Sequence, residues 1–280
     1  MKLLPVDRVT GLTRERFKDE YLKPRRPVIF TDLIDPWPAK NKWTWDYLIE
    51  NFGDVIVPVA DANFSKAGKH YLSPSAHMKF GDYLKTIREK PVDLRIFLYN
   101  ILKNIPELAK DIKPFEIMDG FLDEYPFMFF GGQGSYTRIH YDIDCSHVFL
   151  TQFMTRKRVL LFEPGQAKYL HHLPFTVSCE IDLIDPDEEK FPSLQYLEGY
   201  EAMLTHGETL FIPSCWWHHI EYTDAGYSLA LRASDSIALR ARGAFNIART
   251  FIVDKGMNKL LGPRWANMKV ALARANSQAW

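Results

Sequence analysis

Apolar residues at helical spacing alternate with short apolar runs over the first hundred residues of the chain. Thr13 can cap a helix over residues 13–22, whose apolar face holds Phe17, Tyr21 and Leu22. The remaining elements predicted for this part are helices over 43–52 and 78–87, strands over 27–30, 54–60 and 94–99, and a helical or irregular stretch over 101–124. Together they predict an α/β part over about residues 1–125.

The pattern changes between about residues 126 and 234. Short runs of branched and aromatic residues, such as 148–154, 159–162 and 209–212, are separated by turns rich in Gly, Pro and Asp. Many short strands at close intervals are typical of a sandwich or barrel. We therefore expect a mainly β fold with flanking helices, built on a double-stranded β-helix (jelly roll).

Helical spacing returns after residue 235. Ile237, Ala241, Ala244, Ala248 and Phe251 recur at intervals of four and three, which predicts a helix over about 236–252. A similar stripe of Leu261, Trp265, Met268 and Leu272 predicts a second helix over about 258–276. The sequence thus divides into a main part, 1–234, and a helical segment, 235–280. The two stripes either cover the barrel or form a subunit interface, and we expect a homodimer through these helices.

Composition narrows the class of protein. Lys plus Arg equals Asp plus Glu, 35 each in 280 residues, so no net charge favours nucleic acid or an anionic membrane. No apolar run approaches the length of a membrane span, and the N-terminus does not resemble a signal peptide. Three widely spaced cysteines, Cys145, Cys179 and Cys215, predict free thiols in a reducing, cytoplasmic setting.

Two histidines and one aspartate suggest a metal site. His140 and Asp142 are two residues apart, so on one strand both would point to the same side while Tyr141 points away. His218 follows 76 residues after Asp142 in the sequence Pro-Ser-Cys-Trp-Trp-His-His. Two imidazoles and a carboxylate are the ligands of the facial triad, which binds Fe(II) and leaves the opposite face open.

These motifs resemble those of the JmjC or cupin-like Fe(II)/2-oxoglutarate oxygenases, above all the small protein hydroxylases such as the asparaginyl hydroxylase that acts on hypoxia-inducible factor. The resemblance covers about residues 14–234 and is most specific in 131–142, 149–164 and 207–220. It implies that the first histidine of the His218-His219 pair is the metal ligand. It also implies Fe(II) as the cofactor, with 2-oxoglutarate and molecular oxygen as co-substrates.

The same resemblance implies which residues bind 2-oxoglutarate. Lys157, at the start of the strand after the His-x-Asp segment, matches the lysine that binds the distal carboxylate. Thr137, three residues before His140, matches the hydroxyl that binds the same carboxylate. The chain departs from the pattern at three positions. Val148 and Arg232 occupy places where the family has Asn, and Phe97 occupies the place of a Tyr, for which Tyr99 on the same strand is the candidate replacement. Arg232 is the second candidate for the carboxylate.

The expected function is a 2-oxoglutarate-dependent dioxygenase that hydroxylates a protein side chain or a small molecule. Two alternatives remain open at this point. One is a cupin-like metalloprotein with chemistry other than oxygenation, and the other is a metal-binding scaffold without turnover. Iron- and 2-oxoglutarate-dependent production of succinate would distinguish the three.

Overall fold

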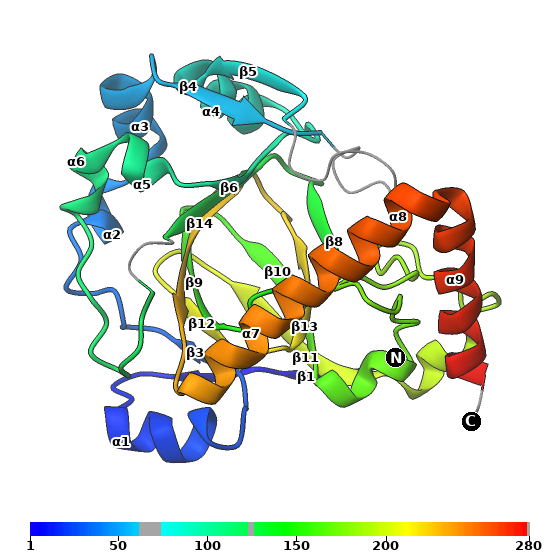
Figure 1. The fold of residues 1–280 in the computed structure, drawn as a ribbon. Coiled ribbons are helices and arrows are strands. Elements are labelled where there is room, and N and C mark those ends of the chain that lie inside the picture. The colour runs from blue at the N-terminus through cyan, green and yellow to red at the C-terminus, as the bar shows by residue number, and fades with distance from the viewer. Residues whose placement is uncertain (62–73, 123–125, 279–280) are drawn as a thin grey trace.

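Two facing β-sheets form the centre of the fold (Figure 1). The computed structural model describes residues 1–61, 74–122 and 126–278. One sheet has the order β1 (Lys2–Pro5), β11 (Glu198–Leu204), β10 (Lys157–Phe162), β13 (Trp217–Glu221) and β8 (Tyr136–His140). The other has the order β2 (Asp7–Val9), β3 (Val28–Phe30), β12 (Thr209–Ile212), β9 (His147–Phe153), β14 (Gly226–Ala233), β7 (Phe127–Gly131) and β6 (Arg95–Tyr99). This arrangement confirms the mainly β, jelly-roll expectation.

The space between the sheets holds an apolar cluster. Alternate residues of each strand point into it, among them Val148 and Leu150 of β9 and Val159 and Leu161 of β10. The intervening residues face outward: Phe149 packs in the cluster behind the seven-stranded sheet, and Leu160 in the cluster behind the five-stranded sheet. Both sheets are therefore covered on their outer faces, and the strands are buried on two sides.

Helices of the N-terminal part cover the outer face of the seven-stranded sheet. Two of these helices begin at a capped end. In the helix that starts at Arg14, Thr13 Oγ1 accepts a hydrogen bond from Arg16 N at 3.3 Å, and in the helix that starts at Trp45, Thr44 Oγ1 accepts one from Tyr47 N at 3.1 Å. The elements are α1 (Arg14–Phe17) with η1 (Lys18–Leu22), α2 (Ala39–Lys42), α3 (Trp45–Phe52), the hairpin β4 (Ile56–Val59) and β5 (Ala76–Lys79), α4 (Phe80–Glu89), α5 (Ile101–Asn104) and α6 (Pro106–Ala109). The predicted helices and strands of this part are confirmed.

The N-terminal part is not a separate layer, because its strands join both sheets. β1 pairs with β11, and β3 pairs with β12. The outer face of the five-stranded sheet is covered instead by the segment between β10 and β11, which contains η3 (Pro164–Lys168) and η4 (Pro192–Tyr196). The boundary expected near residue 125 thus marks a change in the pattern of apolar and turn residues, and the strands on either side of it share the same two sheets.

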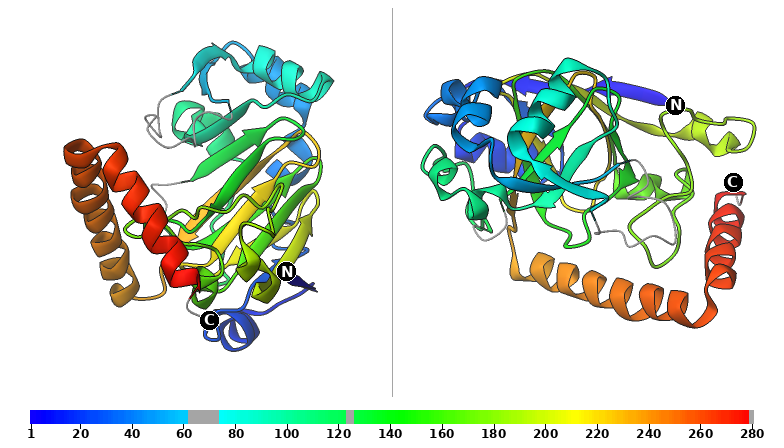
Figure 2. Two further views of the ribbon diagram at one scale, coloured as in Figure 1. Left: turned by 90° about the vertical axis from the view of Figure 1, so that its right-hand side faces the viewer. Right: turned by 90° about the horizontal axis from the view of Figure 1, so that it is seen from above.

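The C-terminal helices form an arm beside the barrel (Figure 2). The arm consists of α7 (Ile237–Arg249), η5 (Thr250–Lys255), α8 (Gly256–Leu261) and α9 (Pro263–Gln278). The expected apolar stripe of α7 does not cover the barrel: Ile237 is 86% exposed. The inward face carries Leu239, Gly243 and Asn246 instead. No described helix is both long and apolar enough to cross a membrane.

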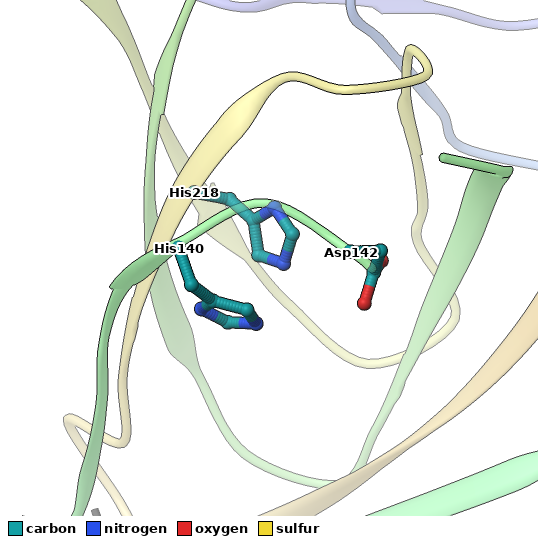
Figure 3. A group of neighbouring side chains, drawn as sticks. All are labelled: His140, Asp142 and His218. Atoms are coloured by element: carbon teal, nitrogen blue, oxygen red, sulfur yellow. The ribbon is translucent and has the colours of Figure 1, made fainter. Parts of the chain in front are cut away.

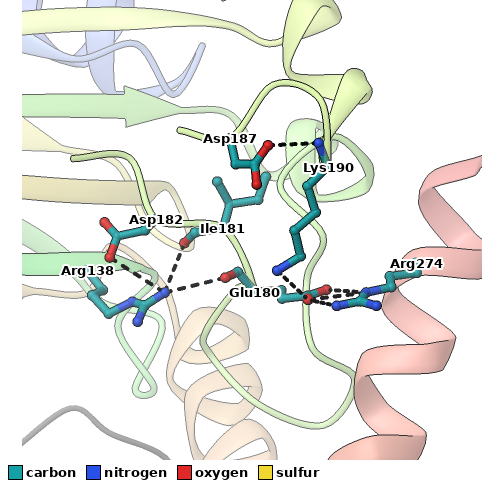
Figure 4. Close-up of polar contacts among 7 residues, drawn as sticks. All are labelled: Arg138, Glu180, Ile181, Asp182, Asp187, Lys190 and Arg274. Carbon is teal, nitrogen blue, oxygen red and sulfur yellow. Dashed lines mark hydrogen bonds and ion pairs between the residues drawn. The ribbon is translucent and has the colours of Figure 1, made fainter. Parts of the chain in front are cut away.

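Polar contacts fix the second half of the arm. Trp265 is buried, donates from Nε1 to Asp254 Oδ1 at 2.8 Å and stacks on Phe175, so it does not lie on a free interface stripe. Arg274 of α9 forms a two-pronged ion pair with Glu180 in the loop after η3 (Figure 4). The arm is therefore tied to the barrel through this loop.

Candidate metal centre and co-substrate pocket

The three predicted metal ligands converge. β8 and β13 are paired so that His140 lies directly opposite His218. The candidate ligand atoms of His140, Asp142 and His218 all lie within 4.8 Å of one another (Figure 3). The sequence had predicted that His140 and Asp142 lie on one strand. The strand β8 ends at His140, however, and Asp142 lies in the turn that follows. That turn still brings its carboxylate to the two imidazoles.

Both imidazoles present the same nitrogen to the centre. Nδ1 of His140 donates to the carbonyl of Arg138 at 2.8 Å, and Nδ1 of His218 donates to the carbonyl of Trp216 at 3.1 Å. A carbonyl can only accept, so the proton is on Nδ1 and the Nε2 lone pair is available. Burial, with His218 nearby, lowers the pKa of His140 to about 3, so this imidazole is neutral and ready to bind a metal.

Arg232 of β14 holds the carboxylate of the triad. Its Nη2 donates to Asp142 Oδ1 at 2.8 Å, and its Nη1 donates to Asp144 Oδ1 at 2.9 Å and to Ser146 Oγ at 3.0 Å. Burial alone would raise the pKa of Asp142, but the guanidinium and His218 hold it well below its ordinary value. The structure thus places Arg232 against the carboxylate of the candidate ligand Asp142. Asp144 and Ser146 were not among the sequence-based candidates.

Helix α7 supports the same turn from outside. Asn246 Nδ2 donates to the carbonyl of Ile143 at 2.8 Å. A Cβ on Gly243 would come within 2.0 Å of the carbonyl oxygen of Asp144, so only glycine allows this approach. Sequence reasoning missed both residues, because the contacts join positions about one hundred residues apart.

Lys157 lies inside the barrel. It is 1% exposed, its Nζ donates to Ser228 Oγ of β14, and it sits 4.1 Å from the centre of the Tyr222 ring. Ser228 in turn donates to Gln152 Oε1 at 2.6 Å. Burial lowers the pKa of Lys157 to about 7. Among the described residues, no ion pair between Lys157 and a carboxylate is found, so a buried cationic site lacks an anion.

Thr137 shares a face with the metal ligands because of an irregularity in β8. Thr137 pairs with Ile220 and His140 pairs with His218, with a register shift between the two pairs. Residues 218 and 220 share one face of β13, and Ile220 packs against the cluster between the sheets. Thr137 and His140 therefore both face the barrel interior although three residues separate them.

The remaining positions singled out in the sequence do not all lie on the same side of the sheet. Val148 pairs with Arg232 and faces the inter-sheet cluster. Phe97 contacts Phe129, which packs against the same cluster. Tyr99 packs against the outer cluster, because β6 shifts register between Ile96 and Tyr99. The structure therefore does not bring Tyr99 to the triad, and the expectation that it shares a face with Phe97 is wrong.

Comparison with known proteins agrees with this geometry. The cupin-like domain family matches residues 14–241. The chain is 30% identical over 246 residues to tRNA wybutosine-synthesizing protein 5 of Gallus gallus, covering 80% of this chain and 75% of that protein. It is 27% identical to lysine-specific demethylase 8 of Xenopus tropicalis (77% of this chain, 50% of that protein). It is also 27% identical to the 2-oxoglutarate and iron-dependent oxygenase JMJD4 of Gallus gallus (77% and 56%).

The chain spans about half the length of some of these relatives. The match nevertheless covers most of the chain, including every strand of the two sheets except β1 and β2, and all three candidate ligands. This protein belongs to the cupin-like (JmjC) domain family, as its motifs had predicted.

Proposed function

We propose that this protein is an Fe(II)- and 2-oxoglutarate-dependent dioxygenase that acts as a hydroxylase. One observation carries the proposal. A two-histidine, one-carboxylate centre faces the same interior as a buried lysine that has no carboxylate partner in the described part of the chain. Lys157 lies four residues along β10 from Leu161, the partner of His218, which is roughly 13 Å of strand. That separation leaves room for a five-carbon dicarboxylate between the side chains at its two ends.

The residues fit Fe(II). Two neutral imidazoles with free Nε2 atoms and one ionised carboxylate form the donor set of non-haem iron oxygenases. Two ligand atoms about 2.1 Å from one ion are at most about 4.2 Å apart. The candidate atoms lie within 4.8 Å of one another, so small side-chain movements would bring all three to one ion. Hydrogen bonds to both imidazoles and to Asp142 orient the ligands before the ion binds.

The residues also fit 2-oxoglutarate. The ammonium of Lys157 would hold the distal carboxylate, with Thr137 and Ser228 as hydroxyl partners. The apolar walls formed by Val159, Ile220 and their neighbours exclude water from the chain between the two ends. When bound, iron supplies the redox chemistry that couples decarboxylation of 2-oxoglutarate to succinate with oxidation of the substrate.

Succinate formation tests this proposal. Purified protein with Fe(II), ascorbate and 2-oxoglutarate should release succinate, and a suitable substrate should raise the rate. His140→Ala should abolish the reaction. Metal binding without any succinate would contradict the proposal and leave both alternatives. Metal-dependent conversion of another compound would then favour the cupin-like metalloprotein, and its absence would favour the metal-binding scaffold.

The substrate is proposed as a class. We propose a protein side chain or a small molecule. A modified nucleoside in RNA is a further candidate, and the name of the wybutosine-synthesizing relatives supports it. A screen of peptides, metabolites and tRNA for stimulated 2-oxoglutarate turnover would decide among them. Mass spectrometry of the stimulating compound should show a gain of one oxygen atom.

We further propose that the arm mediates a homodimer. Phe245 and Ile252, with exposures of 68% and 73%, lie on the outward face of α7 and η5 beside Ile237. Covering such a face is favourable, and a closed dimer buries the same patch on both subunits. Light scattering should give twice the 32.6 kDa chain mass. Ile252→Arg should give a monomer, whereas Trp265, which is buried within its own chain, is no test. A monomeric wild type would refute the dimer.

A cytoplasmic location is proposed from the thiols. Cys145, Cys179 and Cys215 are all free and buried, as expected in a reducing compartment. Fractionation of cells expressing the tagged protein tests this location, and recovery in an oxidising compartment would contradict it.

A further inference from the structure

Two of the three cysteines meet beside the metal centre. The side chains of Cys145 and Cys215 lie in one cluster with Leu239 of α7, close enough for the two thiols to interact. Cys145 is three residues after the ligand Asp142, and Cys215 is three residues before the ligand His218. Each thiol therefore belongs to a turn that carries a metal ligand.

The two turns hold these cysteines in an uncommon conformation. Cys145 has a φ of 52° and Cys215 a φ of 60°, in the left-handed region that non-glycine residues seldom adopt. Hydrogen bonds from Cys145 N to Asp142 O at 3.0 Å and from Trp216 N to Pro213 O at 3.3 Å close the turns. The backbone of each turn thereby aims its thiol at the other.

A small oxidant can reach the pair. Both sulfur-bearing residues line a hollow of about 310 Å³ together with Tyr141, Arg242 and Phe245. The interaction with Cys145, with Arg242 nearby, lowers the pKa of the Cys215 thiol below its ordinary value. A thiol that ionises readily beside a second thiol is the arrangement of a redox-sensitive pair.

We propose that Cys145 and Cys215 form a reversible disulfide when a peroxide oxidises the protein, and that this bond weakens metal binding at the triad. The Cys215 thiolate attacks one peroxide oxygen and releases hydroxide, which gives a sulfenic acid. The Cys145 thiol then displaces that hydroxyl as water, so two thiols and one hydrogen peroxide give one disulfide and two waters. A dithiol reverses the bond by exchange.

The consequence for the metal follows from distances. A disulfide requires the sulfurs to come within about 2.05 Å, closer than two unbonded thiols can lie, so the side chains and the turns that carry them must move. Metal sites tolerate changes of only about 0.2 Å in ligand position. Disturbing the groups that orient ligands commonly costs about 10- to 100-fold in affinity. We therefore expect oxidation to weaken metal binding about tenfold or more.

The experiment treats metal-free protein with hydrogen peroxide, removes the excess and divides the sample. The intact mass should fall by about 2 Da, because forming one disulfide removes two hydrogen atoms. Non-reducing peptide mapping should find the Cys145 and Cys215 peptides joined. Calorimetry with Mn(II), which is inert to the residual oxidant, should show the loss of affinity, and dithiothreitol should restore it. Cys179→Ser is the matched control, because Cys179 lies in a different cluster and should behave as wild type.

Two variants make the test decisive. Cys145→Ser and Cys215→Ser should give no cross-link and should keep their Mn(II) affinity after peroxide. Oxygen addition without a joined peptide, or no reaction, would overturn the proposal. A joined peptide with unchanged Mn(II) affinity would overturn the effect on the metal. The mass measurement needs no bound metal, so its result is independent of the proposed oxygenase function.

Discussion

Replacing Lys157 with methionine should stabilise the protein and weaken 2-oxoglutarate binding. The side chain is 1% exposed, and burial lowers the pKa of Lys157 from its ordinary 10.5 to about 7. Each pKa unit corresponds to about 1.4 kcal/mol, so burying the charged form costs on the order of 4–5 kcal/mol. Methionine has nearly the same length and no charge, so it removes this cost.

The expected gain is smaller than the full cost. Methionine also loses the hydrogen bond to Ser228 and the contact with Tyr222. Replacements of buried charged groups by apolar ones commonly stabilise by about 1–4 kcal/mol. At about 2–4 °C per kcal/mol, the melting temperature of the metal-free variant should rise by at least about 2 °C at pH 6.5.

The pH dependence checks the cause. Because folding lowers the pKa of Lys157, its destabilising effect is complete below pH 7 and fades as the pH rises from about 7 toward 10.5. The difference in melting temperature between Lys157→Met and wild type should therefore shrink between pH 7 and pH 9.5. A difference that does not change with pH would mean that packing, and not charge, is responsible.

Binding of 2-oxoglutarate to Lys157→Met tests the functional role of Lys157. With Mn(II) at the triad, calorimetry should show 2-oxoglutarate binding weakened about 30-fold or more, as expected when one partner of a buried charge pair is removed. Arg156→Met is the matched control, since Arg156 is the neighbouring residue, its side chain is 62% exposed and it pairs with Asp224. A Lys157→Met variant that is less stable than wild type, or that binds 2-oxoglutarate normally, would refute the reasoning.

Three further predictions concern the metal centre. His218→Ala should abolish Mn(II) binding measured by calorimetry, whereas His219→Ala, which changes the neighbouring histidine, should retain it. Gly243→Ala should lower the melting temperature by several degrees and weaken Mn(II) binding, because the new Cβ would collide with a backbone carbonyl of the ligand turn; Gly256→Ala, with open space around it, should do neither. Arg232→Met should weaken Mn(II) binding more at pH 5 than at pH 8, because the pKa of the ligand carboxylate rises when its guanidinium partner is lost and protons then compete with the metal. Equal losses at both pH values would show that the guanidinium acts on geometry alone.

The sequence predicted the features that depend on local spacing. The turn-rich texture of 126–234 indicated the barrel, because short buried strands need frequent turns. His140, Asp142 and His218 could be chosen because few side-chain combinations bind iron, and the structure brings them together. Even there the geometry differed, since Asp142 lies beyond the end of β8.

The sequence could not predict which side chains share a face where a strand shifts its pairing register. Strict alternation places Tyr99 with Phe97, but one shift in β6 moves Tyr99 to the outer face. Alternation would also separate Thr137 from His140, and a second shift, in β8, brings them to the same face. A single sequence does not reveal where a strand shifts register, so these assignments need the pairing itself.

The arm shows why an apolar stripe can mislead. Helical periodicity assumes that the apolar face is buried, yet α7 buries Gly243 and Asn246 because the turn beneath it has backbone groups that need partners. In α9, Lys269 and Trp265 converge on the buried carboxylate of Asp254 for the same reason. Polar satisfaction thus determined which face docks, and the apolar face was left outward.

The turn after β8 is therefore the point where the parts of the molecule meet. It carries Asp142 but lies outside the strand, so no sheet pairing fixes it. Arg232 holds its carboxylates from the seven-stranded sheet, α7 contacts its backbone through Asn246, and Cys145 within it touches Cys215 of the other ligand turn. Side-chain contacts of this kind can be altered one at a time without unfolding the barrel. Changes in the arm, or oxidation of the thiol pair, should consequently alter metal affinity while the barrel stays folded. A purely structural role would instead change stability and metal affinity together.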